Sequence, residues 1–300
     1  MEPTLVAAPP QQASLGRTVF TRRNFLRLAA GSVAGMAFYA GEISRHELEI
    51  VYRTVTLPRL PDPFAGLKIV QISDFHFKEY TEASFLEAVV RRVNEVNPDL
   101  VVMTGDFVSS GPLPRHFSAR MSYHCAEILS QIQCPRRYAI LGNHDALVGA
   151  HAVTDALVTH GIPVLTNTSV ALERDGRRLW LAGTQDALEG RPNLAAALPT
   201  GRNPDQEPLI LLAHEPDFAD HAVGRQIDLV FSGHTHGGQI RLPFLPPLLL
   251  PEMGTKYVEG LFRLRDGMQL HVNRGIGAVN LPFRFRCPPE ISVITLQPRA

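Results

Sequence analysis

The chain of 300 residues has few cysteines: Cys125, Cys134 and Cys287. They form no C-x-x-C pair, and the odd count leaves at least one thiol unpaired within the chain. A disulfide framework is therefore excluded as the basis of the fold. We expect the three thiols to be buried and inert.

The chain also lacks an excess of charge of either sign. Lys plus Arg and Asp plus Glu number 29 each, so the overall charge does not favour nucleic acid as a partner, and we expect none. It also lacks internal repeats and low-complexity tracts. The hydrophobic fraction of 45% is that of an ordinary globular protein with a sizeable core.

A long hydrophobic run is missing too. Residues 28–41 are rich in Ala and Gly, and about 14 residues are too few to span a hydrocarbon core of ~30 Å comfortably. The preceding stretch, residues 21–27 (Thr-Arg-Arg-Asn-Phe-Leu-Arg), resembles a twin-arginine export signal. This pattern predicts that residues 1–45 are a signal or membrane anchor with a disordered start. The protein would then be exported and be periplasmic, cell-wall or membrane-associated.

Two questions about this segment stay open. The arginines could instead be the positive flank of an amphipathic or transmembrane helix. No clean A-x-A cleavage site follows the apolar run, so the segment could be removed or could stay as a tether.

The rest of the chain reads as one α/β domain, residues 46–300. Residues 45–63 predict an introductory strand and linker, and residues 67–72, 99–104 and 138–141 predict buried strands joined by helices at 81–97 and around 123–132. Such an arrangement is parallel and right-handed. A hairpin centred on Asp175-Gly176 and strands at 209–213 and 227–232 indicate a second sheet, which we expect strands near 269–272 and 291–296 to complete.

Metal-binding residue types follow most of these strands. The clusters are Asp74-x-His76, Gly105-Asp106, Gly142-Asn143-His144-Asp145, His214 and Gly233-His234-x-His236. Carboxylate, amide and imidazole groups suit divalent transition metals, and the carboxyl ends of neighbouring strands meet at one edge of a sheet. A pair of cations about 3.5–4 Å apart needs a bridging carboxylate and several further ligands, and these clusters supply both.

As an ordered set, these motifs resemble those of the calcineurin-like metallophosphoesterase family, in the branch with an amino-terminal signal or anchor. The resemblance covers residues 68–239. Together with the two expected sheets it implies a four-layer α-β-β-α sandwich of two mixed sheets with a dinuclear site at the strand ends. It also implies the roles of individual residues.

By matching motif, Asp74, His76 and His236 would hold one metal, Asn143, His214 and His234 the other, and Asp106 would bridge them. A metal-bridging hydroxide would attack phosphorus while His144 assists the leaving group. Asp145 would orient His144. Gly105, Gly142 and Gly233 fit positions where a side chain would crowd the ions. Mn, Fe, Zn, Co and Ni all suit these ligands, and the sequence does not choose among them.

The substrate is less determined. The apolar, proline-broken segment Leu242–Pro251 could pack over the second sheet, or it could form an apolar wall or membrane-dipping loop for a lipid-linked phosphoester. Arg274, Arg284 and Arg286 are candidate phosphate-side cations. A phosphodiesterase is the leading hypothesis. The alternatives are a pyrophosphatase resembling the UDP-2,3-diacylglucosamine enzymes of lipid A synthesis, and a non-catalytic, wall-associated metal-binding protein. The sequence does not report the oligomeric state.

Overall fold

The computed structural model describes residues 21–247 and 249–299, which divide into two compact units. The first unit, up to Phe38, contains α1 and the second begins at Tyr39. The helices are α1 Arg22–Phe38, α2 Ala83–Val96, α3 Arg115–Ser130, α4 Asn143–Thr159, α5 Leu194–Ala197 and α6 Ala219–Ala222. The strands are β1 Glu49–Leu57, β2 Lys68–Ile72, β3 Leu100–Met103, β4 Arg137–Ala139, β5 Thr168–Arg174, β6 Arg177–Gly183, β7 Leu209–Leu212, β8 Leu229–Ser232, β9 Gly260–Arg263, β10 Gln269–Val272 and β11 Glu290–Pro298.

The helix α1 buries none of its residues. It begins at the arginine pair of the predicted export signal, and residues 1–20 of that signal lie outside the described residues. Among the described helices, none combines the length and the apolar character needed to cross a bilayer.

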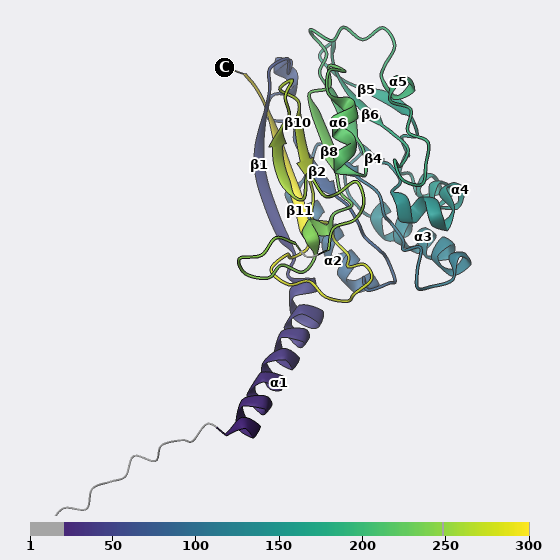
Figure 1. The fold of residues 1–300 in the computed structure, drawn as a ribbon. Coiled ribbons are helices and arrows are strands. Elements are labelled where there is room, and N and C mark those ends of the chain that lie inside the picture. Colours follow the sequence, from purple (N-terminus) through teal and green to yellow (C-terminus); the bar gives the residue numbers. More distant parts are fainter. Residues whose placement is uncertain (1–20, 248, 300) are drawn as a thin grey trace, which may run out of the picture. The chain divides into compact units, whose positions relative to one another are not determined.

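The second unit, called the catalytic unit below, is built on two mixed sheets (Figure 1). The first sheet has the strand order β1-β11-β2-β3-β4, in which only the pairing of β11 with β2 is antiparallel. The second has the order β5-β6-β7-β8-β10-β9, parallel from β6 to β10 and antiparallel at both edges. The predicted α/β fold with two mixed sheets is confirmed.

Alternation along each strand separates three cores. On β2, Ile69 faces the core between the two sheets and Val70 faces the core beneath α2, α3 and α4. On β8, Leu229 and Phe231 face the core between the sheets, while Val230 faces the outer side of the second sheet. Each fully buried side chain of this kind contributes about 1.5–3 kcal/mol to folding.

The outer layer on the second sheet is thin. It contains the one-turn helices α5 and α6, whose Ala197, Ala219 and Ala222 pack on that face. The order of layers is therefore the one expected, with most of the helical mass on the first sheet.

Two expectations about elements were wrong, and one helix was missed. β11 lies between β1 and β2 in the first sheet and does not complete the second, whose last strand is β9. The helix α3 begins at Arg115, well before the predicted Tyr123. The helix α4, which follows the Gly-Asn-His-Asp motif, was not predicted, and it is interrupted at Gly149, where φ is 141°. The three cysteines are free and buried, as expected.

Candidate metal centre

The seven predicted metal ligands lie at one end of both sheets. They follow β2, β3, β7 and β8 or begin α4, so each stands where a buried strand ends or a helix starts. The loops bring together Asp74, His76, Asp106, Asn143, His214, His234 and His236.

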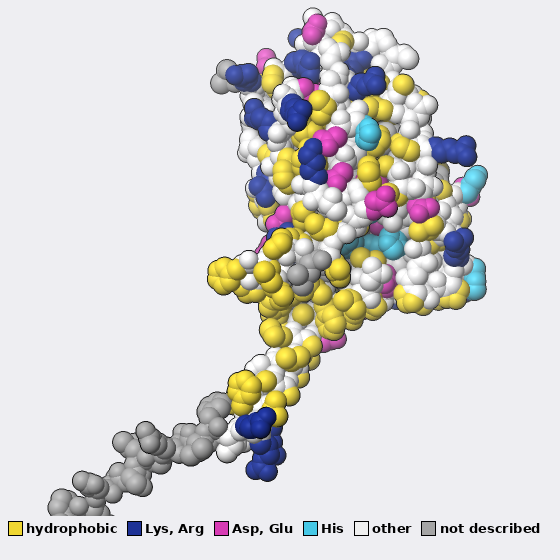
Figure 2. All heavy atoms as spheres, in the orientation of Figure 1, with side chains coloured by type: hydrophobic (Ala, Val, Ile, Leu, Met, Phe, Trp, Pro, Cys, Tyr) yellow, Lys and Arg dark blue, Asp and Glu magenta, His cyan; other side chains and the backbone are white. Residues whose placement is uncertain are grey.

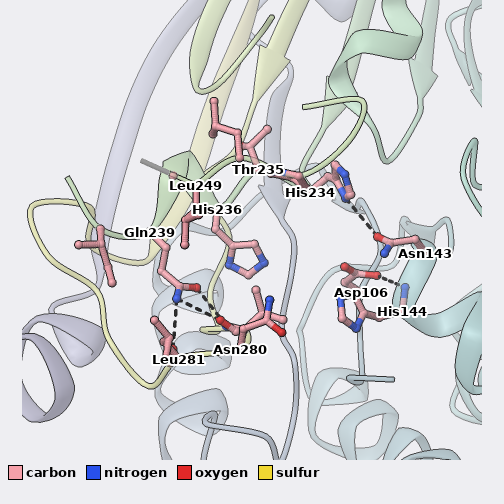
Figure 3. A pocket seen from close by; sticks show the side chains of 15 residues that line it. Asp106, Asn143, His144, His234, Thr235, His236, Gln239, Leu249, Asn280 and Leu281 are labelled. Carbon is pink, nitrogen blue, oxygen red and sulfur yellow. Dashed lines mark hydrogen bonds between the residues drawn. The ribbon is translucent and has the colours of Figure 1, made fainter. Parts of the chain in front are cut away.

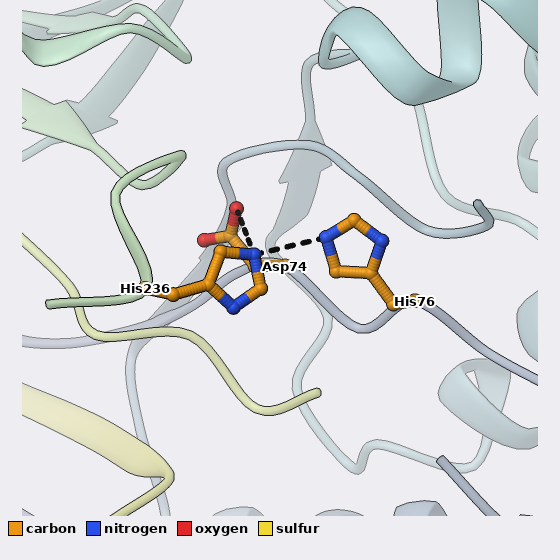
Figure 4. A group of neighbouring side chains, drawn as sticks. All are labelled: Asp74, His76 and His236. Carbon is orange, nitrogen blue, oxygen red and sulfur yellow. Dashed lines mark hydrogen bonds and ion pairs between the residues drawn. The ribbon is translucent and has the colours of Figure 1, made fainter. Parts of the chain in front are cut away.

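The first group consists of Asp74, His76 and His236, all buried (Figure 4). The Nε2 atoms of His76 and His236 are 3.0 Å apart, and His236 Nε2 is 3.7 Å from Asp74 Oδ1. The backbone N–H of His234 donates to the same Asp74 oxygen at 2.8 Å. The Asp74 carboxylate is therefore held in place by the loop that supplies His236.

The second group lies on the other side of Asp106. His234 Nδ1 is 3.1 Å from Asn143 Oδ1, and His214 Nε2 is 3.2 Å from Asp106 Oδ2. The same Asp106 oxygen is 3.6 Å from Nε2 of His76 in the first group. Asp106 thus stands between the two groups, as a bridging carboxylate would.

Hydrogen bonds behind the imidazoles orient them toward the centre. His214 donates from Nδ1 to the carbonyl of Thr104 at 2.6 Å, and His234 donates from Nε2 to the carbonyl of Glu252 at 2.8 Å. Each donation leaves the lone pair on the other ring nitrogen, which faces the cluster. Such backing is typical of metal-binding histidines.

Five of these residues have a left-handed backbone. The φ angles are 51° at Asp74, 43° at His76, 56° at Asp106, 72° at His234 and 51° at His236. This conformation costs roughly 1–2 kcal/mol for a residue with a side chain, and it persists only where the surroundings impose it. Its concentration here marks a functional site.

Glycines leave room for the ligand side chains at the three positions where we expected them to leave room for the ions. A Cβ on Gly105, where φ is 98°, would lie 2.7 Å from His214 Nδ1. One on Gly142 would overlap Asp106 and the His214 ring, and one on Gly233 would overlap the Asp74 carboxylate. The ligand loops therefore approach too closely for side chains at these three positions.

Burial and neighbouring charges shift the pKa values of the cluster in different directions. Burial, partly offset by His214, raises the pKa of Asp74 to about 6, with the nearby Asp106 adding to the shift. Burial alone would lower the pKa of His214, but the charge of Asp106 raises it well above its usual value. Burial also lowers the pKa of His234 to about 4, which keeps its imidazole neutral and able to bind a cation.

Two buried atoms of the cluster, Asp74 Oδ2 and His214 Nε2, have no hydrogen-bond partner among the described residues. Unpaired buried polar atoms are costly, so such atoms usually have an unseen partner. Oxygen and imidazole donors without thiolate suit a divalent transition metal. The residues fit such a group.

His144 and Asp145 do not interact as predicted. The backbone N–H of Ser110 donates to His144 Nδ1 at 3.1 Å, and Ser110 Oγ lies 3.0 Å from the same nitrogen. Asp145 instead accepts backbone N–H groups of Gly142, Phe107 and, at 3.2 Å, Val108. We expected Asp145 to orient His144. That prediction is wrong, because the first turn of α4 directs the Asp145 carboxylate toward backbone N–H groups and not toward His144.

The predicted phosphate-side arginines do not face the cleft, although Arg284 Nη2 lies 3.4 Å from His236 Nδ1, behind that predicted ligand. Arg284 is fully buried and donates to the carbonyls of Cys287, Arg274 and Gly277. Arg274 pairs with Glu290 and with Glu49 at 2.7 Å. Arg286 is exposed. None of the three lines the cleft at the metal centre.

That cleft has a volume of ≈ 370 Å³ (Figure 3). One wall is made by Asp106, Asn143 and His144 and the other includes apolar residues of the predicted 242–251 segment. Sequence reasoning missed the contribution of residues 279–281, which no motif in the sequence marks. The apolar lining residues are Ile240, Leu249, Leu250, Pro251, Val279 and Leu281.

Comparison with known proteins agrees with this geometry. The family model of calcineurin-like phosphoesterases matches residues 67–238. The metallophosphoesterase YkuE of Bacillus subtilis is 36% identical over 94% of this chain and 98% of its own length. The phosphodiesterase YaeI of Escherichia coli is 28% identical, over 93% of this chain and the whole of its own. The UDP-2,3-diacylglucosamine pyrophosphatase LpxG of Chlamydia trachomatis is 29% identical, over 78% of this chain and 86% of its own.

The family model spans more than half of the chain and ends two residues after His236, the last predicted ligand. Its match contains all of the clustered residues, from Asp74 to His236. The chain therefore belongs to the calcineurin-like phosphoesterase family and is a metal-dependent phosphoric ester hydrolase.

Proposed function

We propose that the protein is a phosphodiesterase that uses two divalent transition-metal ions. Asp74, His76 and His236 would hold one ion, and Asn143, His214 and His234 the other, with Asp106 between them. The observation that carries this proposal is the position of Asp106 Oδ2, within 3.6 Å of His76 Nε2 and 3.2 Å of His214 Nε2. When bound, such ions neutralise phosphoryl oxygens and lower the pKa of a bound water. Mn, Fe, Zn, Co and Ni remain candidates.

His144 is suited to assist the leaving group. Because Nδ1 accepts the N–H of Ser110, the proton of the neutral ring resides on Nε2. His144 lines the cleft, and one of its ring nitrogens lies within 4.8 Å of ligand atoms of His76 and Asp106. The N–H held there can donate a hydrogen bond to the departing alcohol oxygen and stabilise the negative charge that develops on it.

The charge of the cleft favours a diester over a monoester. Among the described residues, no Lys or Arg lines it. A phosphate monoester carries a charge between about −1.5 and −2 near pH 7, whereas a diester carries a single negative charge. Two cations bound by carboxylates would therefore suffice for the diester. For a monoester, no Lys or Arg among the described residues lines the cleft to neutralise the second charge.

A substrate screen tests this proposal. Purified protein is loaded with each candidate metal and assayed with bis-p-nitrophenyl phosphate and p-nitrophenyl phosphate. We expect the diester to be preferred. A preference for the monoester would indicate a phosphatase, and inactivity with every metal would refute the catalytic proposal in favour of a metal-binding protein without turnover.

A second candidate is a pyrophosphatase acting on a nucleotide-activated lipid. It is supported by the similarity to the pyrophosphatase LpxG and by the apolar wall of the cleft. Mass spectrometry of the products from UDP-2,3-diacylglucosamine decides between the candidates. Release of UMP and the acylated sugar phosphate would favour this second function.

We also propose export through the twin-arginine route. The proposal is supported by the Arg22-Arg23 pair at the start of α1 and by the exposure of the whole helix. Replacing both arginines with lysine keeps the charge and should abolish export. Cell fractionation measures where the protein is found. Unchanged export of that variant would contradict the twin-arginine route and favour a helix whose arginines serve only as its positive flank.

A further inference from the structure

Two loops at the mouth of the cleft expose large apolar side chains. Phe244 is fully exposed, Leu249 is 76% exposed and Leu245 is 53% exposed. Figure 2 shows hydrophobic side chains gathered at the end of the catalytic unit that carries these loops, with histidine side chains at the border. We call the set the apolar rim: Leu242, Phe244, Leu245, Leu249 and Leu281.

The rim belongs to segments without charge. Neither residues 242–251 nor residues 275–283 contain Asp, Glu, Lys or Arg. Of the first segment, Leu248 lies outside the described residues. Single exposed apolar residues are ordinary, but a contiguous apolar surface at a binding cleft marks an interaction site. The rim was one of two possibilities for Leu242–Pro251, and its exposure argues against packing over the second sheet.

The two loops are joined into one platform by Gln239. Its Nε2 donates to the carbonyls of Val279 and Leu281 at 3.1 Å each, and its Oε1 accepts the N–H of Val279 at 3.0 Å. The backbone adds bonds between Arg241 and Phe285 and between Phe285 and Gln239. Gln239 caps the short turn His236–Gly238, which begins at the last predicted ligand, so the rim is positioned by the same turn as the metal centre.

The rim continues into the cleft. Leu249 and Leu281 are exposed, and both also line the cavity that contains His144 and Asp106 (Figure 3). A protein partner covering the rim would close the entrance to the metal centre. A lipid surface can cover the same side chains and still deliver a substrate, because a lipid molecule can move from the surface into the cleft.

The chain also enters the catalytic unit at this face. The ring of Tyr39 packs edge-on against Phe285 at 6.3 Å between centroids, and the N–H of Arg284 donates to the carbonyl of Ala40. The loop that carries Leu281 therefore holds the first residues after α1. An amino-terminal anchor would be joined to the catalytic unit next to the rim.

We propose that the apolar rim docks on a lipid bilayer and that the substrate is an amphiphilic phosphodiester drawn from it. The acyl or alkyl chain of the substrate lies along Leu249 and Leu281 while its phosphate reaches the metal centre. This inference rests on the proposed phosphodiesterase function and specifies its substrate class. The docking surface is a separate claim that is measured without turnover.

Insertion of the rim is measured by fluorescence. The full chain with Phe244→Trp is mixed with phosphatidylcholine vesicles, with and without phosphatidylglycerol, whose acyl chains carry bromine as a quencher. The matched control, Val158→Trp, places an exposed Trp at the far end of α4, where Val158 is 54% exposed. Both variants keep α1 and Trp180, so tethering and background are equal. We expect a blue shift and quenching for the first variant only.

The consequence for turnover is measured with two matched diesters. Ethyl p-nitrophenyl phosphate is soluble, and hexadecyl p-nitrophenyl phosphate is carried in vesicles. The double variant Phe244→Ser/Leu245→Ser changes rim residues that do not line the cleft. We expect its kcat/KM to fall by about tenfold or more for the hexadecyl ester, because burying two large apolar side chains is worth at least that factor. The value for the ethyl ester should stay unchanged.

The outcomes separate this inference from the proposed function. Hydrolysis of the ethyl ester without insertion of the Trp at position 244 would overturn the docking surface and leave the phosphodiesterase standing. Insertion without hydrolysis of either ester would do the reverse. If the serine variant instead turns a dimer into a monomer in size-exclusion chromatography and no insertion occurs, the rim is a contact between copies, and the inference is wrong.

Discussion

At the scale of single residues, His144 and Asp145 are neighbours with separate roles. His144 borders the cleft and has its Nδ1 held by Ser110, whereas Asp145 is buried and binds three backbone N–H groups. Those N–H groups belong to the loop after β3 and the turn before α4. Asp145 therefore joins the two loops that carry Asp106 and Asn143. Replacing His144 should affect turnover, whereas replacing Asp145 should affect the stability of the fold.

Replacing His144 with Ala should slow turnover of the diester by about 10²-fold or more, because a positioned hydrogen-bond donor to a developing oxyanion contributes a factor of that order. Metal content, measured by elemental analysis, should stay near normal, since His144 is not among the predicted ligands. His151→Ala is the matched control, as His151 is 96% exposed on its side chain. Wild-type turnover in the His144 variant would refute the role.

Replacing Asp145 with Ala should destabilise the fold. Three buried N–H donors lose their acceptor, at about 1–3 kcal/mol each, so the free energy of unfolding should fall by about 3 kcal/mol or more. Urea unfolding in EDTA measures this without a contribution from metal. Asp155→Ala, on the exposed face of α4, should change the same quantity by no more than ~0.5 kcal/mol. Equal stabilities of the two variants would contradict the account.

At the scale of elements, the metal centre depends on how closely the turns after the strands approach one another. Gly142 precedes α4 and faces both Asp106 and His214, which come from loops after β3 and β7. The two sheets thus meet at this glycine. A single methyl group there is enough to separate the loops that supply the second group of ligands.

Gly142→Ala should therefore bind less metal while its secondary structure, measured by circular dichroism, stays intact. Elemental analysis after dialysis gives the metal content, and we expect a clear loss. In the control Gly35→Ala, the added methyl group meets nothing within 4 Å, so metal content should match wild type. Full metal content in Gly142→Ala would show that the loops can shift without cost.

At the scale of the whole molecule, a metal bound at the candidate centre would link the two sheets. The ligands follow β2 and β3 of the first sheet and β7 and β8 of the second, so a bound ion resists separation of the layers. Without metal, Asp74 and Asp106 share a buried site, and burial is the largest cause of the raised pKa of Asp74.

Metal should raise the melting temperature, and the gain should depend on pH. A ligand that binds only the folded state adds about 2.7 kcal/mol at a concentration 100 times its Kd. In metal-free protein the pKa of Asp74 is raised from 3.8 to about 6, so the stability that its protonated form provides is lost as pH rises through about 6. Ionised Asp74 is also the form that binds a cation. The difference in melting temperature between Mn²⁺-loaded and EDTA-treated protein should thus grow from pH 4 to pH 7. A gain that is constant over this range would contradict the role of Asp74.

Local patterns determined the chemistry of this protein. A short apolar run predicts a strand, and the residues just after it, such as Asp74, Asp106 and His214, lie at the strand end whatever the rest of the fold does. The ligand residues, the family and the two-sheet architecture follow from such signals because each depends on a few neighbouring residues. The crowding at Gly142 was also readable, since a glycine beside a ligand has few other reasons to be there.

Contacts between distant segments were decided only by the tertiary structure. The place of β11 between β1 and β2, the contact of Ser110 with His144, and the burial of Arg284 each join residues far apart in the chain or set by a loop path. The same holds for the exposure of Phe244, since an apolar proline-rich segment can pack inward or face solvent. No local pattern carries that choice, because it depends on which surface the rest of the fold leaves uncovered.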